Sequence, residues 1–158
     1  MATVTFNGVF PVHGCKFEIS TNGDVATPNY AEPKDLESLN IQIDNNVETW
    51  SPLDQNGWQR AMSTGKGYTI NVSGKRNLGD PGNDYLAGKR FAMGRDCDSK
   101  YRITFPNNDT LSGGVVVSNT DDLGASTDVA ALGCDLISNG KPTFTGGGPL
   151  GSPAFEEK

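Results

Sequence analysis

The feature of this sequence that most constrains its fold is the alternation of apolar and polar residues in short segments. In residues 39–44, Leu39, Ile41 and Ile43 occupy every second position, with polar residues between them. Successive side chains of a β-strand point to opposite faces, so this pattern predicts a strand with one buried and one solvated face. Other strand-like segments are residues 3–10, 13–20, 68–74, 100–105, 111–118 and 128–138.

Residues 80–93 interrupt the strand pattern and favour a helix. Asp80 is a good N-cap, and Pro81 suits the first helical position, where a backbone N–H has no partner anyway. Leu86 and Met93 would then lie on one side of the helix. We therefore predict one short helix over residues 80–93. Together, the segments predict a mainly β protein, a β-sandwich or β-barrel with one flanking short α-helix.

Residues 45–66 have no useful periodicity, and they hold both tryptophans, Trp50 and Trp58. We predict a long loop, and a loop of this length in a compact domain is usually functional. Because disorder disfavours aromatic residues, we expect this loop to pack against something. Its tryptophans either fold back on their own domain or anchor an interface with a neighbouring subunit. The residues alone leave both alternatives open.

The length of 158 residues fits one domain. We expect that domain to span residues 1–144 and to be followed by a flexible tail, residues 145–158, which is rich in glycine and proline. The three cysteines are odd in number and widely spaced, without a C-x-x-C pair. A disulfide framework or a zinc site is therefore not expected.

The chain is acidic, with a formal net charge of -6 and a sequence pI near 4.6. This balance excludes the basic footprint of a nucleic-acid-binding domain, and any DNA that meets the protein should be repelled. The sequence contains no apolar run long enough to span a membrane and no secretory signal at its start. We therefore expect synthesis in a reducing cytosol.

Catalytic and metal-binding patterns are weak. His13 is the sole histidine, so a Ser-His-Asp or Cys-His unit would have to use it, and its position at a strand start favours a structural or surface role. The acidic residues do not match a calcium-binding loop. We expect no catalytic residue, no metal and no cofactor.

The order of these features resembles the major tail tube proteins of long-tailed, siphovirus-type bacteriophages. The similarity covers roughly residues 10–145, and its specificity lies in the order and spacing of loose motifs. After the strand at 39–44, the motifs are Trp50-Ser-Pro52, Gly57-Trp58-Gln-Arg-Ala-Met62, residues 64–74, Gly79-Asp-Pro-Gly-Asn-Asp-Tyr-Leu86, the strand at 101–106, and Gly140-Lys-Pro-Thr143.

The resemblance implies a virion structural protein with the tail-tube fold. Hexameric rings of such proteins stack into a hollow tube, through which the DNA genome passes without specific binding. The partners implied are further copies of the chain, a tape-measure protein, a tail terminator and a distal tail protein. The implied location is the virion tail, after assembly in the host cytoplasm and without a membrane.

Carried onto this chain, the resemblance makes residues 45–66 a long inter-ring loop, and it implies an acidic lumen. The residues expected to act in self-assembly are Trp50, Pro52, Leu53, Trp58 and Met62. The polar faces of the strongest strands provide the lumen candidates, which are Gln42, Asp44, Asn71 and Ser73.

Three alternatives stay open at the level of sequence. Another tail component of the same fold, such as a terminator or distal tail protein, would show the same pattern. A carbohydrate-binding β-sandwich could use Trp50 and Trp58 as a stacking platform, and it predicts a stable monomer. A small hydrolase could be built on scattered carboxylates, and it predicts a titratable pair in a cleft. Tubes of the same fold also occur in contractile tails.

Overall fold

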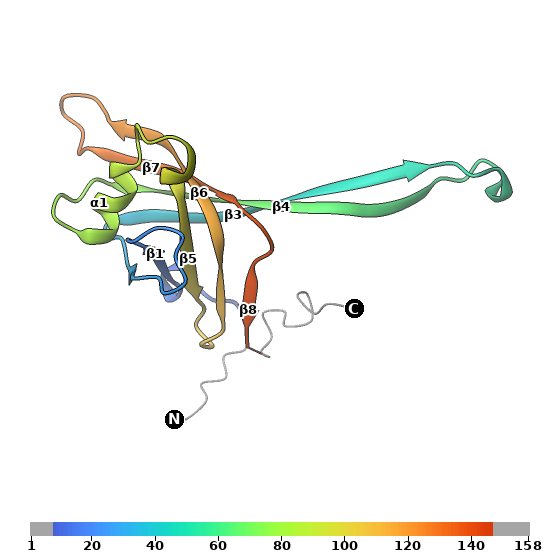
Figure 1. Cartoon of the computed structure of the whole chain (residues 1–158), viewed down its shortest axis with the longest axis horizontal. Helices are drawn as coiled ribbons and strands as arrows, with labels where there is room; N and C mark the ends of the chain where they lie inside the picture. Colours follow the sequence, from blue (N-terminus) through green and yellow to red (C-terminus); the bar gives the residue numbers. More distant parts are fainter. Residues whose placement is uncertain (1–7, 147–158) are drawn as a thin grey trace.

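The computed structural model describes residues 8–146 and shows a mainly β protein with one α-helix, as predicted. Figure 1 shows a body of crossed strands, from which one long hairpin projects. The strands are β1 (Lys16–Ser20), β2 (Tyr30–Ala31), β3 (Leu36–Trp50), β4 (Arg60–Lys75), β5 (Asp98–Thr104), β6 (Thr110–Leu123), β7 (Ala131–Ser138) and β8 (Thr143–Thr145). The helices are α1 (Pro81–Gly88) and the short 3-10 turns η1 (Val12–Gly14), η2 (Leu53–Gln55) and η3 (Gly94–Cys97).

All strand pairs belong to one antiparallel sheet, in the order β2-β1-β5-β6-β7-β4-β3, with β8 also paired to β6. The long strand β6 joins two parts of this sheet. Its first half, Thr110–Val116, pairs with β5, and its second half, Val115–Leu123, pairs with β7. In Figure 1, β3 and β4 run along the long axis while β5 and the first half of β6 cross it, so that the sheet folds over on itself. This arrangement fits the predicted sandwich or barrel.

The core lies between the two parts of the folded sheet. In β4, Ile70 and Val72 are buried, and in β5, Tyr101 and Ile103 are buried, as the alternation in those segments predicted. α1 adds Leu86 and Ala87 to the same core. The other buried apolar members of the cluster are Phe17, Ile19, Val115, Val117, Leu132, Cys134 and Leu136.

The helix is shorter than predicted. α1 begins as expected, with Asp80 as the N-cap whose carboxylate accepts a hydrogen bond from the backbone N–H of Asn83 at 3.1 Å. It ends at Gly88, so the predicted extension to residue 93 was wrong. Leu86 is buried, whereas Met93 finds no apolar surface on its own subunit. Glycine also disfavours continuation of a helix.

β6 is longer than predicted. The predicted strand ended at residue 118, but Asn119–Leu123 also belong to β6 and pair with β7 across a β-bulge between Asn119 and Asp121. The residues here are polar because the strand end is exposed, and solvated strands carry no alternation signal.

The predictions for the two chain ends fall partly outside the described residues. Of the predicted strand at residues 3–10, only residues 8–10 are described, and they are not in a strand. The predicted tail at 145–158 lies outside the described residues from Gly147 onward. Thr145 is the last residue of β8.

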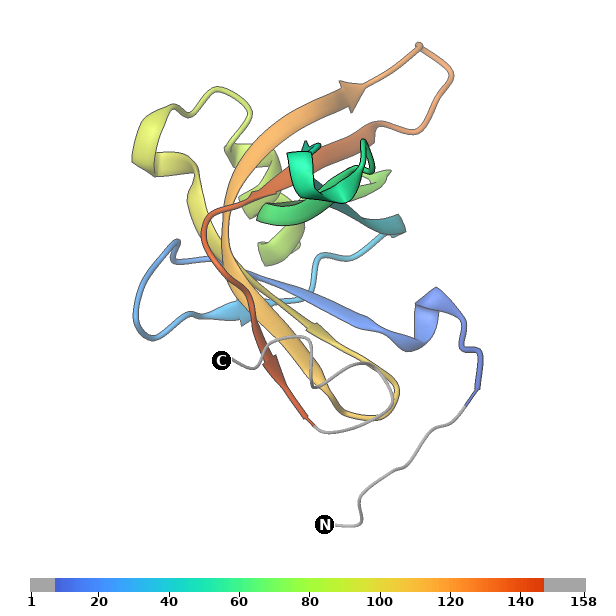
Figure 2. The same ribbon diagram turned by 90° about the vertical axis from the view of Figure 1, so that its right-hand side faces the viewer.

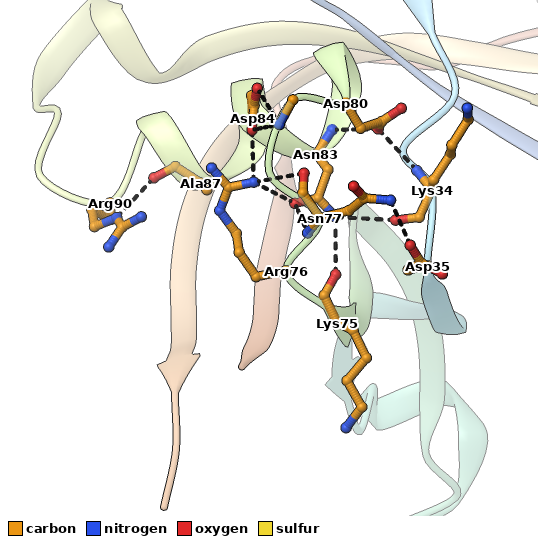
Figure 3. Close-up of polar contacts among 11 residues, drawn as sticks. Lys34, Asp35, Lys75, Arg76, Asn77, Asp80, Asn83, Asp84, Ala87 and Arg90 are labelled. Carbon is orange, nitrogen blue, oxygen red and sulfur yellow. Dashed lines mark hydrogen bonds and ion pairs between the residues drawn. The ribbon is translucent and has the colours of Figure 1, made fainter. Parts of the chain in front are cut away.

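A buried asparagine attaches α1 to the sheet (Figure 3). The Asn83 side chain accepts hydrogen bonds from Arg76 Nη1 at 2.8 Å and from the Asn77 backbone N–H at 3.0 Å. It donates to the carbonyls of Lys34 and Lys75, both at 3.0 Å. One side chain therefore connects α1 to the end of β4 and to the segment that enters β3, where it positions the base of the hairpin.

Replacing Asn83 with alanine should lower the free energy of unfolding by about 2–4 kcal/mol, because buried carbonyls and an N–H lose their partners. Urea denaturation of the purified subunit measures the change. Asn40→Ala, on an exposed position of β3, is the matched control and should change stability by less than about 0.5 kcal/mol. Equal free energies of unfolding for the two variants would show that the hydrogen bonds of Asn83 do not stabilise the attachment of α1 to the sheet.

Candidate assembly surfaces

The predicted loop at residues 45–66 is instead the outer half of a long β-hairpin, so that prediction was wrong in its secondary structure. β3 and β4, of 15 and 16 residues, pair from Leu36 opposite Gly74 to Trp50 opposite Arg60, with register shifts between Leu36 and Ser38 and between Asn46 and Val47. Only residues 51–59, which include η2, form the connecting turn. The outer half of the hairpin is exposed on both faces, so nothing in its sequence had to alternate.

The hairpin extends far beyond the body along the long axis of the molecule (Figure 1). Figure 2 looks along it from the tip and shows the turn standing in front of the sheet. No further layer of its own subunit covers the projecting part. Because a two-stranded hairpin without a covering layer is only marginally stable in water, a partner that packs on it would stabilise it.

The side chains predicted to act in self-assembly lie together at and near this tip, and they do not pack into the core. The exposed fraction is 77% for Trp58 and 44% for Trp50. Leu53 is fully exposed and Met62 largely so, while Pro52 is half-buried. The alternative in which the tryptophans fold back on their own domain therefore does not describe the subunit. Exposed apolar side chains grouped in this way typically mark an interaction surface.

Two long stretches of strand edge are open in the described part of the chain, in addition to the short terminal strand β2. Among the described residues, β3 pairs only with β4, so its other edge is free along the whole strand. The end of β6, Ser118–Leu123, pairs with β7 on one side, because β5 reaches only as far as Val116. Long open edges promote association with other strands.

The four lumen candidates share one face of the sheet, opposite the core. The pairs Leu39 with Val72 and Ile41 with Ile70 point inward, and the intervening positions of β3 and β4 point outward. Gln42, Asp44 and Ser73 are exposed there, and Asn71 is half-buried.

The outward face contains acids that the sequence analysis did not single out. Asp135 of β7 lies opposite Asn71, and Asp121 of β6 lies opposite Gly133. With Asp44, three carboxylates occupy this face, and Lys75 lies at its far end. The alternation of Leu132, Cys134 and Leu136 was the signal for Asp135, because it assigns the residue between Cys134 and Leu136 to the outer face.

An apolar groove of about 450 Å³ lies where the hairpin joins the body, and its lining includes Ile41, Ile43, Leu111 and Pro142. Tyr68 and Tyr101 also line it, and the Tyr101 hydroxyl donates a hydrogen bond to that of Tyr68 at 2.9 Å. Burial raises the pKa of both tyrosines, so the groove holds no phenolate at physiological pH.

His13, the residue that a histidine-dependent catalytic unit would have to use, is exposed in η1. Across residues 8–146, no group of three or more histidine, cysteine or acidic side chains could hold a metal ion. Within the same range, no helix has the length and apolar character needed to cross a membrane.

Comparisons with known proteins identify the fold. No protein-family model matches the sequence. No curated protein matches it either. Among solved structures, the tail of an empty gene transfer agent particle with C6 symmetry contains a similar chain, with a TM-score of 0.71 and 14% identity. The virion of the native gene transfer agent contains another, with a TM-score of 0.67 and 12% identity. Each match covers 87% of this chain and 100% of the matched chain. The protein thus has a fold found in phage-like tail particles.

Proposed function

We propose that this chain is a structural tail protein of a phage or phage-like particle and, more specifically, the subunit of its tail tube. One observation carries the proposal. A fold shared with chains of gene transfer agent particles presents a long hairpin with an exposed apolar tip and two open sheet edges. A subunit built to remain alone would leave these surfaces uncovered at a cost, whereas stacked rings would cover them.

The strand directions are compatible with closure of a ring. The strands β6, β7, β4 and β3 alternate in direction, and the first and last of them provide the open edges. Because the number of strands is even, β3 of one copy meets β6 of the next in antiparallel orientation when copies are related by rotation. Each junction then gains a ladder of backbone hydrogen bonds. A hexameric ring would match the C6 symmetry of the similar tail.

The outward face of these four strands would line the lumen. Its carboxylates, Asp44, Asp121 and Asp135, repel DNA phosphates and let the genome pass without adhering. Gln42, Asn71 and Ser73 supply neutral polar groups between them. The protein would therefore act without catalysis, metal or cofactor.

The hairpin would join successive rings. Residues 43–50 alone span roughly 27 Å at the rise of an antiparallel strand, so the tip reaches well beyond its own ring. Other partners in the particle would be a tape-measure protein, a terminator and a distal tail protein, and assembly would take place in the host cytoplasm.

Negative-stain electron microscopy of the concentrated, purified protein tests the proposal. We expect hollow tubes, or six-fold rings that stack as the concentration rises. Single rings that never stack would indicate a terminator or distal tail protein of the same fold. A uniform monomer that binds glycans in a screen would favour the carbohydrate-binding alternative, because exposed tryptophans suit that function as well.

A further inference from the structure

The hairpin tip needs a receiving surface on the next ring, and the chain itself contains a candidate. The tip, residues 48–60, has two acids, Glu48 and Asp54, and one base, Arg60, which lies opposite Trp50. Among them lie the exposed apolar side chains of the turn. A complementary partner would combine exposed apolar side chains with positive charge.

Residues 85–95 have this character. They contain three bases, Lys89, Arg90 and Arg95, and no acid. Phe91 and Met93, between these bases, are 89% and 83% exposed. The segment follows α1, which lies at the end of the molecule opposite the hairpin tip (Figure 1). Subunits stacked head to tail along the hairpin therefore bring the two surfaces together.

The segment is held in place before any partner arrives. Arg90 pairs with Asp122 and donates through Nε to the carbonyl of Ala87 at 3.1 Å. The Lys89 ammonium lies over the Tyr85 ring, 4.9 Å from its centre. Such preorganisation lowers the entropic cost of binding. Arg95 pairs with Asp98 but keeps a side chain that is mostly exposed.

We propose that the hairpin tip of one subunit docks on residues 89–95 of a subunit in the adjacent ring, with Leu53 contacting Phe91 and Asp54 close to Arg95. This inference rests on the proposed tube. The β6–β7 loop, residues 124–130, also lies away from the hairpin and exposes Val129, but it carries Asp128 and neither lysine nor arginine, so it offers the acids of the tip no opposite charge.

Cysteine cross-linking tests the contact. Tubes of the double variant Leu53→Cys, Phe91→Cys should form disulfides under a mild oxidant and give a ladder of multimers on a non-reducing gel. The matched control, Leu53→Cys with Val129→Cys, should give no ladder. The native cysteines interfere little, because Cys97 and Cys134 are buried, Cys15 is half-buried, and burial raises the pKa of Cys15 and of Cys134, the latter to about 12. The single variant Leu53→Cys, which should give no ladder, controls for Cys15.

A charge exchange tests the same contact without cysteine. Arg95→Glu should leave rings intact and lower the yield of sedimentable tubes roughly tenfold, and Asp54→Lys in the same chain should restore it. Wild-type tubes together with neither cross-linking nor rescue would overturn the docking site alone. Failure of the wild-type protein to form any tube would instead overturn the proposed function.

Discussion

Replacing Gly74 with alanine is expected to lower the free energy of unfolding by more than about 3 kcal/mol and to leave much of the protein insoluble. A Cβ at this position would overlap the carbonyl oxygen of Asp35 and would lie 2.6 Å from Leu36 Cα and 2.8 Å from the backbone nitrogen of Glu37. All three neighbours are backbone atoms, so no side chain can turn aside. The start of β3 would have to move away from β4.

Urea denaturation and soluble yield measure the effect of Gly74→Ala. Gly88→Ala is the matched control, because no atom beyond its chain neighbours and the nearby backbone of its own helix lies within 4 Å of its Cβ position, and alanine favours the helix. We expect that control to be neutral or to stabilise the protein by up to about 1 kcal/mol. A Gly74→Ala variant as stable as the wild type would mean that β3 does not enter the sheet where the structure has it.

Trp50→Ala is expected to prevent tube growth while leaving the subunit folded. The side chain is 44% exposed at the end of β3 and contributes nothing to the buried core, so the subunit should lose at most about 1 kcal/mol. An aromatic anchor at an interface is worth roughly 2 kcal/mol. In the proposed hexameric ring, about six such contacts would form at once, so the expected loss per added ring is on the order of 10 kcal/mol.

Sedimentation of tubes across a concentration series measures the effect of Trp50→Ala, and thermal unfolding of the subunit measures its folding. Val12→Ala, which shortens another exposed apolar side chain, should change neither property. Normal stacking by the Trp50 variant, or unfolding of its isolated subunit, would contradict the assembly role of the hairpin.

Periodicity predicted those elements whose two faces meet different surroundings. The segments around Ile70 in β4 and around Tyr101 in β5 have one face on the core and the other on solvent or polar neighbours, so their apolar residues had to alternate. The start of α1 could also be predicted from the sequence, because the Asp80 carboxylate accepts a hydrogen bond from a backbone N–H only three residues away. Local signals of this kind need no knowledge of distant residues.

Periodicity did not predict the strand segments that are exposed to solvent on both faces. The outer hairpin and the end of β6 carry no buried face in the subunit, so their sequences look like loops although their backbones form ladders. Likewise, Met93 suggested a longer helix because apolar residues usually mark a buried side. In this subunit Met93 and its neighbour Phe91 are exposed, and their positions suit a contact with another copy.

The sequence by itself determined the mainly β class, the core-facing residues of the central strands, the cap of the helix and the acidic character of the chain. Only the tertiary structure decided that residues 45–66 extend as a hairpin, that the outward acids share one face and that two strand edges stay open. Strand pairing and the placement of surfaces depend on contacts between residues far apart in the chain, and a one-dimensional pattern does not encode which strands become neighbours.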